Sequence, residues 1–421
     1  MAELNGKLSC AVAGLGRIGS SLEKDALREK PCTHTGAVAG NPDCVLAAGC
    51  DIKPEARERF LKDWGHLSPK PGVFDSVDEL LTKLVPQILV VATYPESHYR
   101  IVKKAAAAGV PVIVCEKPLA DTLRSARKIA ALHRKGAATV LVNHERRYSS
   151  DYLAVREAIA QRRYGRLISV RGTLYFGRSS RHKDVLLHDG THLVDIINFL
   201  LEEARGPAAR GPAARGPAAR DPAACSLRKA NPVRLERRSG SMRSNRGSAY
   251  LFGTASRAGR PSRTESPGAG GGAVPTSRAA EGGGIPVVIE VGAERDHLVF
   301  EVELSFERGR IRVGNGVLSF EASGESPYYE GYRSLLPDEA PEIGKTGYFS
   351  NMIADAVRCA RQRQAADVAG NAEGGSGRRA EGINGADGAD SAAGGETCEP
   401  VSSAADGYAV MKYIRSMRGL L

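Results

Sequence analysis

Three glycines near the start of the chain form a G-x-G-x-x-G motif. The motif follows a short apolar run and precedes a segment of helical character, which is the context in which it binds the pyrophosphate of a dinucleotide. The first glycine permits a tight turn, the second lets the backbone approach the phosphates, and the third lets helix and strand pack closely. Free N–H groups at the helix start then face the phosphates. The residues predicted to bind a dinucleotide are Gly14, Gly16, Arg17, Ile18 and Gly19.

An acidic residue at the end of the second strand sets the choice of coenzyme in such folds. Asp51 follows the apolar run Val45–Cys50, but it lies 32 residues past the glycine motif, where the usual spacing is about 20. We interpret Glu29–Cys44 as an insertion that accounts for the excess. A carboxylate at Asp51 would accept hydrogen bonds from the ribose hydroxyls and repel a 2′-phosphate, which favours NAD. Lys53 and Arg57 keep NADP open, and an N-cap role for Asp51 is compatible with either coenzyme.

If an NAD bound at this site serves to oxidise a secondary alcohol, the reaction needs a base for the hydroxyl proton and a cation for the developing alkoxide. His192 has the titration range of a general base near neutral pH. Lys117 follows the strand-like run Val110–Cys115 and can stabilise the charge on oxygen or shuttle the proton; the alternative is an ordinary solvated lysine. Asp195, one turn after His192, could orient the imidazole. The hydride chemistry itself belongs to the coenzyme.

Further polar residues fall near the expected crevice. Thr93 and His98 follow the apolar run Ile88–Ala92 and are candidates for coenzyme contact. A structural role at a helix start is an equal alternative for His98. Arg147 and Tyr148 are candidates for substrate contact, with an ordinary surface position as the alternative.

His188 and His192 are four residues apart, a spacing that could place both on one helix face for zinc. Gly190 between them weakens a helix, and the sequence offers no evident third ligand. We therefore predict no metal site. His188 is instead a candidate for the proton relay, and Asp189 is a candidate for substrate binding.

The scaffold for these residues follows from the order of apolar runs. Between Lys7 and about Asn143, short apolar runs alternate with helical segments, the first of them expected at Arg17–Arg28. This alternation predicts an α/β domain over residues 1–144, with a buried parallel sheet whose strand C-termini form a ligand crevice.

The second part of the chain, residues 145–421, has a different pattern. Strand-like runs bounded by glycine predict an α+β domain with a largely antiparallel open sheet. These runs are Leu167–Gly177, Ala249–Thr254, Val287–Val291, Leu298–Phe306 and Arg310–Val313. Ser350–Arg363 and Gly407–Met417 are expected to be closing helices.

Three low-complexity segments, near residues 204–230, 257–284 and 366–399, interrupt this domain. The first repeats ARGPA in tandem, and a proline at every fifth position forbids helix and central strand. We interpret all three as disordered loop insertions without a catalytic role. Residues 204–284 hold fifteen basic and four acidic side chains, which accounts for the net charge of +11. Because this charge lies in insertions and not on a folded face, we predict no specific nucleic-acid partner.

The eight cysteines are scattered without a C-x-x-C motif, and the N-terminus does not have the pattern of a secretory signal. No apolar run is long enough to cross a bilayer. We therefore expect a cytoplasmic protein with reduced thiols and no membrane partner.

Glu116-Lys117-Pro118, after a strand and downstream of the glycine motif, resembles the Gfo/Idh/MocA oxidoreductases, relatives of glucose–fructose oxidoreductase and inositol dehydrogenase. Thr93…His98 and the run Gly190–Asp195 add to the resemblance. It covers residues 7 to about 201, about 285–345, and the closing helix around 407–418.

The resemblance implies a doubly wound Rossmann domain followed by a domain with a large open sheet that often mediates homo-oligomers. It also implies hydride transfer between NAD(P) and a carbinol of a sugar, cyclitol or related polyol. Lys117 and His192 would be catalytic, and Glu116 would lie at the coenzyme. The chain departs from the family at His188, where an aspartate is common, and at Tyr94, where a proline usually follows the threonine.

The leading interpretation is thus an NAD(P)-dependent dehydrogenase or reductase acting on a CH–OH group of a small molecule. One alternative is an NAD-dependent glycoside hydrolase that works by transient oxidation and elimination. The other is a non-catalytic protein that binds a nucleotide or a sugar.

Overall fold

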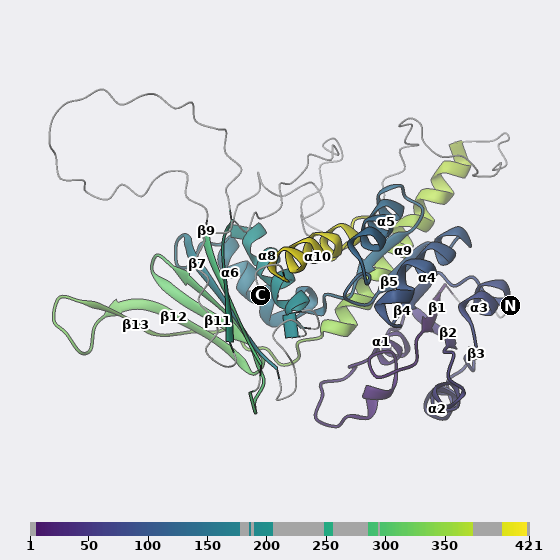
Figure 1. Ribbon diagram of the computed structural model, residues 1–421, viewed down its shortest axis with the longest axis horizontal. Helices are drawn as coiled ribbons and strands as arrows, with labels where there is room; N and C mark the ends of the chain where they lie inside the picture. The colour runs from purple at the N-terminus through teal and green to yellow at the C-terminus, as the bar shows by residue number, and fades with distance from the viewer. Residues whose placement is uncertain are drawn as a thin grey trace. The chain divides into compact units, whose positions relative to one another are not determined.

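The computed structural model describes residues 6–176, 185–186, 189–204, 248–255, 285–293, 295–373 and 398–418. The chain forms two compact units (Figure 1). The first comprises Met1–Ser150 and Ile343–Lys412, and the second comprises Asp151–Glu342 and Tyr413–Leu421.

The first unit contains a six-stranded parallel sheet with the strand order β3-β2-β1-β4-β5-β6. Its strands are β1 (Leu8–Ala13), β2 (Cys44–Cys50), β3 (Gly72–Phe74), β4 (Ile88–Val91), β5 (Val112–Cys115) and β6 (Thr139–Val142). All residues of β1, β4, β5 and β6 are buried, as expected for a sheet covered on both faces. The order reverses between β1 and β4, so a ligand crevice is expected at the C-terminal ends of these strands. The predicted parallel sheet is confirmed.

Helices cover both faces of this sheet. On one face, α1 (His34–Gly40), α2 (Pro54–Trp64) and α9 (Tyr348–Glu373) contribute to one apolar core. On the other face, α3 (Val77–Lys83), α4 (Pro95–Ala107), α5 (Leu123–Arg134) and the start of α10 (Ala404–Arg418) contribute to a second core. The sheet is therefore doubly wound.

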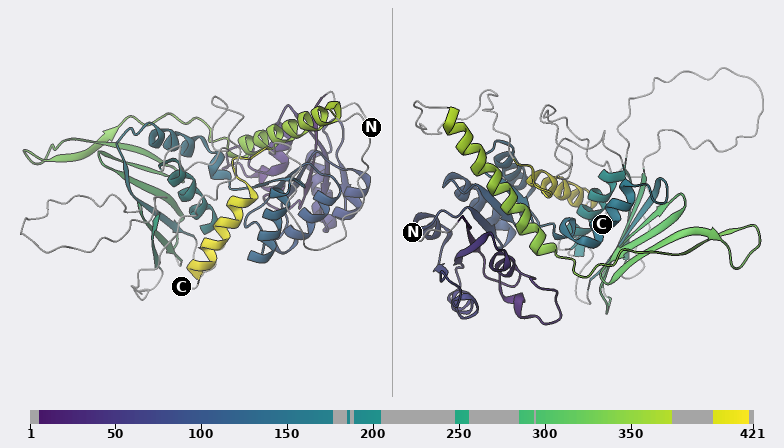
Figure 2. Two further views of the ribbon diagram at one scale, coloured as in Figure 1. Left: turned by 90° about the horizontal axis from the view of Figure 1, so that it is seen from above. Right: turned by 180° about the vertical axis from the view of Figure 1, so that it is seen from behind.

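Helix α9 comes from the far end of the chain and packs against β4, β5 and α1 (Figures 1 and 2). The helices that follow β4 and β5 in sequence lie on the opposite face, so without α9 this part of the sheet would be exposed. The predicted division at residue 144 differs from the structure for this reason. Residues of Ile343–Lys412 belong with the N-terminal residues, not with the second unit.

The first helix of the unit is not at Arg17–Arg28, and that prediction is wrong. The segment forms only a 3-10 turn, η1 (Ser21–Lys24), and the helix begins at His34, capped by the Thr33 hydroxyl, which accepts from the Gly36 N–H. The insertion predicted from the spacing of Asp51, Glu29–Cys44, contains this helix, whereas the inserted loop precedes the helix.

Hydrogen bonds show that the insertion interrupts the helix of the glycine turn. The N–H groups of His34 and Thr35 donate to the carbonyl oxygens of Ile18 and Gly19, at 3.1 and 2.9 Å. In a continuous helix these carbonyls would accept from N–H groups four residues onward. The chain therefore leaves the helix after the glycine turn and re-enters it about twelve residues later than a continuous helix would.

Two carboxylates of the inserted loop, those of Glu23 and Glu29, hold it in place by hydrogen bonds. Glu23 accepts hydrogen bonds from the Cys32 N–H and the Thr33 hydroxyl. Glu29 accepts from the N–H and hydroxyl of Thr346 and from the Gly347 N–H, at 2.8–2.9 Å. Partial burial opposes ionisation of Glu29, but these hydrogen bonds outweigh it and lower its pKa. The loop thus binds the segment that leads into α9.

The second unit contains a seven-stranded sheet with the order β13-β12-β11-β10-β7-β9-β8, in which only the pairing of β7 with β9 is parallel. Its strands are β7 (Leu167–Tyr175), β8 (Ser248–Ala255), β9 (Ile285–Gly292), β10 (Val299–Phe306), β11 (Gly309–Gly314), β12 (Val317–Glu325) and β13 (Arg333–Asp338). The helices α6 (Ser150–Ala160) and α8 (Gly190–Ala204) precede β7 and β8. Helix α8 packs on the sheet at Gly172, where a Cβ would meet the Ile197 side chain at 2.8 Å. The largely antiparallel sheet is confirmed.

The predicted insertions fall mostly outside the described residues, which exclude 205–247, 256–284 and 374–397. The third insertion was expected to begin at 366, but α9 continues to Glu373. Alanine, glutamine and aspartate between 364 and 368 continue the helix that Ser350–Arg363 predicted.

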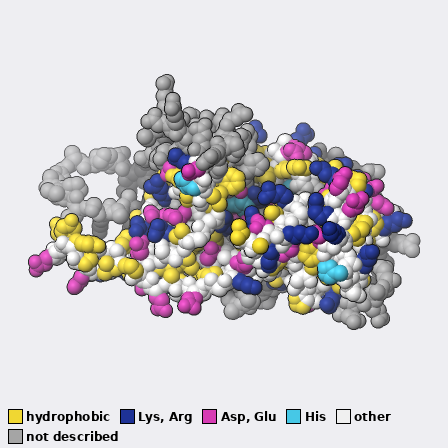
Figure 3. All heavy atoms as spheres, turned by 90° about the horizontal axis from the view of Figure 1, so that it is seen from below, with side chains coloured by type: hydrophobic (Ala, Val, Ile, Leu, Met, Phe, Trp, Pro, Cys, Tyr) yellow, Lys and Arg dark blue, Asp and Glu magenta, His cyan; other side chains and the backbone are white. Residues whose placement is uncertain are grey.

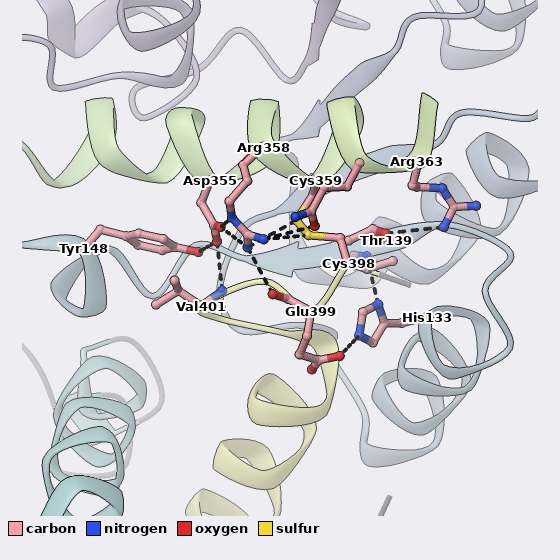
Figure 4. The surroundings of a disulfide bond; sticks show 12 residues. His133, Thr139, Tyr148, Asp355, Arg358, Cys359, Arg363, Cys398, Glu399 and Val401 are labelled. Carbon is pink, nitrogen blue, oxygen red and sulfur yellow. Dashed lines mark hydrogen bonds and ion pairs between the residues drawn. A yellow bond between two sulfur atoms is a disulfide. The ribbon is translucent and has the colours of Figure 1, made fainter. Parts of the chain in front are cut away.

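Two of the cysteines form a disulfide, Cys359–Cys398, which corrects the expectation of reduced thiols throughout. The bridge joins α9 to the segment before α10 (Figure 4). Beside it, the Asp355 carboxylate accepts from the Tyr148 hydroxyl, the Val401 N–H and the Arg358 guanidinium. The bridge and this carboxylate fix the same segment, which then pairs with β6.

We expect replacement of both cysteines by serine to lower the free energy of unfolding by about 2–4 kcal/mol, because the bond restricts the unfolded chain. Thermal unfolding of the wild type should shift to lower temperature in dithiothreitol, whereas the double variant should be insensitive to it. Alkylation and mass analysis of the native protein that found both thiols free would contradict this assignment.

Candidate active site

The glycine turn lies between β1 and the inserted loop, at the edge of the sheet where the strand order reverses. Gly14 has a φ of 95°, and a Cβ there would overlap the Ala92 carbonyl. A Cβ on Gly19 would overlap the Gly14 carbonyl, whereas Gly16 is exposed and has open space around it. Each glycine therefore has the local geometry that its predicted role requires.

Backbone donors in this turn are available to an anion. The Ser20 N–H donates to the Gly16 carbonyl at 3.0 Å. Among the residues that the structure describes, the N–H groups of Arg17, Ile18 and Gly19 have no acceptor. A turn of unpaired N–H groups beside an open glycine fits a pyrophosphate.

Asp51 lies at the end of β2, next to the glycine turn. Its Oδ2 accepts from the Leu15 N–H at 2.8 Å, and its Oδ1 accepts from the Lys53 N–H at 2.9 Å. Arg57 binds the backbone carbonyl of Asp51 at 2.8 Å and not its carboxylate. The side chain is half-buried, so its carboxylate is fixed in direction and still reaches solvent. This placement fits a ribose diol.

His98 is completely buried in α4, between the loops that follow β4 and β5. Its Nε2 lies 3.0 Å from the Thr93 carbonyl, and its Nδ1 lies 3.3 Å from the Leu119 carbonyl. The Thr93 hydroxyl pairs with the Ser97 hydroxyl at 2.7 Å. His98 therefore ties two crevice loops together and is not placed for direct coenzyme contact, which corrects that prediction.

Glu116, at the end of β5, has its carboxylate inside the protein. Its Oε1 accepts from His34 Nε2 at 2.7 Å and from Asn143 Nδ2 at 2.6 Å, and its Oε2 accepts from the Lys117 N–H at 3.1 Å. Burial alone would raise its pKa, but these donors and the charges of His34 and Lys117 lower the pKa to about 2. Both oxygens of Glu116 accept from donors inside the protein, which corrects the prediction that Glu116 contacts the coenzyme. Its carboxylate instead links His34, Asn143 and the backbone of Lys117.

Lys117 is half-buried where β5 leaves the sheet, and its peptide bond to Pro118 is cis. A second carboxylate, that of Glu145, interacts electrostatically with it. Loss of solvation and the charge of Glu116 raise the pKa of Glu145, and Arg146 and Lys117 oppose this. Burial and the charge of Glu145 also raise the pKa of Tyr348 to about 12. The ammonium group thus belongs to a cluster of ionisable groups at the strand ends.

Arg147 and Tyr148 are buried, which corrects both the substrate-contact prediction and the surface alternative. The Arg147 guanidinium binds the Val401 carbonyl at 3.1 Å and lies 3.4 Å from the Asp406 carboxylate. The Tyr148 hydroxyl donates to Asp355 at 3.0 Å (Figure 4). Both side chains hold the returning C-terminal segment.

The remaining candidates lie in the second unit. His192 and Asp195 are buried in α8, and Asp189 is half-buried just before it. The backbone carbonyl of Asp189 accepts from the His192 N–H at 3.1 Å. His188 lies outside the described residues. Lys117 and His192 therefore come from different units, and their cooperation is a proposal below.

Sequence reasoning missed the partners of Glu116. The sequence does not point to His34, because the inserted loop separates it from the glycine motif. Asn143 directly follows an apolar strand, but it is not among the predicted site residues. Polar residues that follow buried parallel strands were the signal that could have found Asn143 and Glu145.

The surface of the first unit carries basic side chains. In the face drawn in Figure 3, Lys and Arg gather over the part of the surface that belongs to this unit. Its exposed bases include Arg17 in the glycine turn and Lys53 beside Asp51. Such a surface attracts a dinucleotide with its two phosphates.

In the ranges that the structure describes, no group of three or more His, Cys, Asp or Glu side chains could hold a metal ion. No helix in those ranges is long and apolar enough to cross a membrane.

The N-terminal part of the first unit is similar to a known family. Residues 8–144 match the oxidoreductase family with an NAD-binding Rossmann fold, Gfo/Idh/MocA. An uncharacterised oxidoreductase of Schizosaccharomyces pombe is 30% identical over 137 residues, which are 30% of this chain and 37% of the relative. Inositol 2-dehydrogenase of Rhizobium meliloti is 28% identical over 203 residues, which are 45% of this chain and 54% of the relative.

The second unit also follows a known arrangement. The crystal structure of an oxidoreductase from Agrobacterium radiobacter, in complex with NAD+, L-tartaric acid and magnesium, matches 97% of this chain and 95% of its own, with a TM-score of 0.58 and 13% identity. At this identity the similarity shows the fold alone. In sequence, this chain spans only about a third of the length of the first curated relatives that it matches.

The Glu116 network predicts a pH dependence of stability. Since folding lowers the pKa of Glu116 from about 4.5 to about 2, its stabilisation is complete above about pH 4.5 and is lost as the pH falls toward 2. We expect Glu116→Gln to cost roughly 2–3 kcal/mol at pH 7, with the cost shrinking below pH 4.

Urea unfolding of the wild type and the variant between pH 7 and pH 3 measures this difference. Glu58→Gln, on the exposed surface of α2, is the matched control and should show no such trend. A cost for Glu116→Gln that is independent of pH would contradict the ionised carboxylate.

Proposed function

We propose that the protein is an NAD-dependent oxidoreductase that transfers a hydride between the nicotinamide and a carbinol carbon of a sugar, cyclitol or related polyol. The observation that carries the proposal is the position of Lys117. Lys117 comes just after β5, at the same edge of the sheet as the glycine turn and Asp51, and its backbone N–H donates to the Glu116 carboxylate.

The chain's residues support this in separate ways. The N–H groups of Arg17, Ile18 and Gly19 would bind the pyrophosphate, and Asp51 would bind the ribose hydroxyls near the adenine. A bound NAD would supply the hydride acceptor, and the protein would supply the geometry. Lys117 would then hydrogen-bond the substrate hydroxyl and stabilise the negative charge that develops on its oxygen.

The proton of the substrate hydroxyl needs an acceptor. His192, at the first turn of α8, is proposed as that base, with His188 and Asp189 in the proton relay and in substrate binding. The substrate class rests on the relatives, since inositol 2-dehydrogenase of Rhizobium meliloti shares 28% identity over 203 residues with this chain.

The function is tested by incubating the purified protein with NAD or NADP and a panel of inositols, aldoses, anhydro sugars and sugar acids, with absorbance at 340 nm as the readout. We expect reduction of NAD by at least one polyol. Cleavage of an aryl glycoside that needs NAD but yields no net NADH would instead indicate the glycosidase alternative. Absence of NADH binding altogether would reject the proposal.

Asp51 should decide between the two coenzymes. Asp51→Ala removes a charged acceptor, so we expect NADH binding to weaken about 10- to 100-fold, while NADPH binding weakens less or improves because Lys53 and Arg57 remain. Fluorescence titration measures both dissociation constants. Asp43→Ala, at the opposite end of β2, is the control, and equal losses for the two coenzymes would argue against this assignment.

Lys117 should matter for turnover more than for coenzyme binding. Lys117→Met keeps the length of the side chain without its charge, and we expect kcat to fall about 10²- to 10⁴-fold. NADH binding should remain within a few-fold of the wild type. Lys103→Met, on the exposed face of α4, should be as active as the wild type. Retention of full activity by Lys117→Met would refute the proposed mechanism.

A further inference from the structure

A buried histidine contacts the carboxylate that binds the backbone of Lys117, the lysine of the proposed mechanism. His34 is the first residue of α1 and is completely buried. We propose that His34 is a positioning residue for Lys117 and acts through the Glu116 carboxylate. The inference rests on the proposed function for the role of Lys117, whereas the contacts among the three residues do not depend on it.

The peptide of Lys117 lies just beyond the end of the hydrogen-bond ladder of the sheet. The last ladder bonds run from the Glu116 N–H to the Val91 carbonyl, at 2.9 Å, and from the Asn143 N–H to the Cys115 carbonyl, at 2.8 Å. The next N–H group, that of Lys117, donates to Oε2 of Glu116 at 3.1 Å. The side chain of Glu116, and no longer the neighbouring strand, therefore orients the backbone of Lys117, whose side chain bears the ammonium group.

The carboxylate can orient this peptide only if its own direction is fixed. His34 on α1 and Asn143 after β6 both donate to Oε1, at 2.7 and 2.6 Å. Charge-assisted hydrogen bonds of this length are strong and directional. Rotation of the carboxylate would break at least one of its three bonds, so the donor from α1 contributes directly to the position of Lys117.

Besides Glu116, His34 has an aromatic neighbour and interacts electrostatically with the Glu145 carboxylate. Its ring packs edge-on against Phe349 of α9, with 5.2 Å between the ring centroids. Its Nδ1 is buried without a hydrogen-bond partner in the described part of the chain. Because Glu116 is an acceptor, Nε2 must carry the hydrogen of this bond. In the described part of the chain, the hydrogen bond of the His34 ring is therefore the one to Glu116, and replacement of His34 removes it.

Two substitutions separate positioning from packing. His34→Leu fills the site but removes the donor, and His34→Gln retains an N–H donor directed toward Glu116. With the substrate of the panel that the wild type turns over fastest, we expect kcat to fall about tenfold in His34→Leu. The KM for the coenzyme should stay within about twofold of the wild-type value. His34→Gln should recover most of kcat. His66→Leu, at an exposed histidine after α2, is the matched control.

A second readout does not require turnover. Limiting acetic anhydride labels lysines in the folded protein, and mass spectrometry gives the rate at Lys117 relative to the exposed Lys103. We expect this ratio to rise several-fold in His34→Leu, because the peptide of Lys117 loses its anchor, and to stay near the wild-type value in His34→Gln and His66→Leu.

An unchanged labelling ratio in folded His34→Leu, or a fall in coenzyme affinity with kcat unchanged, would overturn the positioning role. If the wild type oxidises no substrate, the proposed function fails, and the labelling ratio still decides the role of His34. Should His34→Leu not fold, His34→Asn, whose shorter side chain keeps a donor away from Glu116, replaces it in both measurements with the same expected result.

Discussion

Burial of an ionised carboxylate is the constraint on which the first unit depends. Glu116 is 6% exposed, and a charge in such a place costs several kcal/mol unless donors surround it. The donors come from α1, from the residue after β6, and from the next backbone N–H along the chain. One charge thus links the helix that continues the glycine turn to the ends of β5 and of the edge strand β6.

This link explains how the unit tolerates an insertion in a critical turn. The loop between the glycine turn and α1 interrupts the helix, yet the hydrogen bonds from His34 and Thr35 to Ile18 and Gly19 restore its path. The contact of His34 with Glu116 then fixes the re-entering helix against β5. Glu29 in the same loop binds the segment before α9, so the insertion also contributes to the closure of the sheet.

The far end of the chain completes the same unit. Helix α9 covers the part of the sheet that the helices after β4 and β5 leave exposed, and the disulfide and Asp355 hold the following segment along β6. Arg147 and Tyr148 are engaged in this packing, which is why side chains so near the strand ends do not face a substrate.

Local patterns predicted the sheet and the glycine turn, because alternating apolar runs and the spacing of Gly14, Gly16 and Gly19 reflect nearby sequence alone. The place of α1, the division between units and the disulfide depend on contacts between residues far apart in the sequence, such as the 82 residues that separate His34 from Glu116. For the same reason Glu116 was predicted beside the coenzyme, whereas its partners turn it into the interior. Asp51 lies at the end of β2 as predicted, although the range predicted for the insertion, Glu29–Cys44, contains α1.

The central claim is that a dinucleotide binds at the C-terminal ends of β1, β2, β4 and β5. Hydrogen–deuterium exchange of the full chain, with and without saturating NADH, tests it most directly. The account predicts slower exchange in peptides that contain the glycine turn, the residues after Asp51 and the segment around Lys117, with little change at the opposite edge of the sheet. Unchanged exchange in all three places, or protection confined to other parts of the chain, would contradict it.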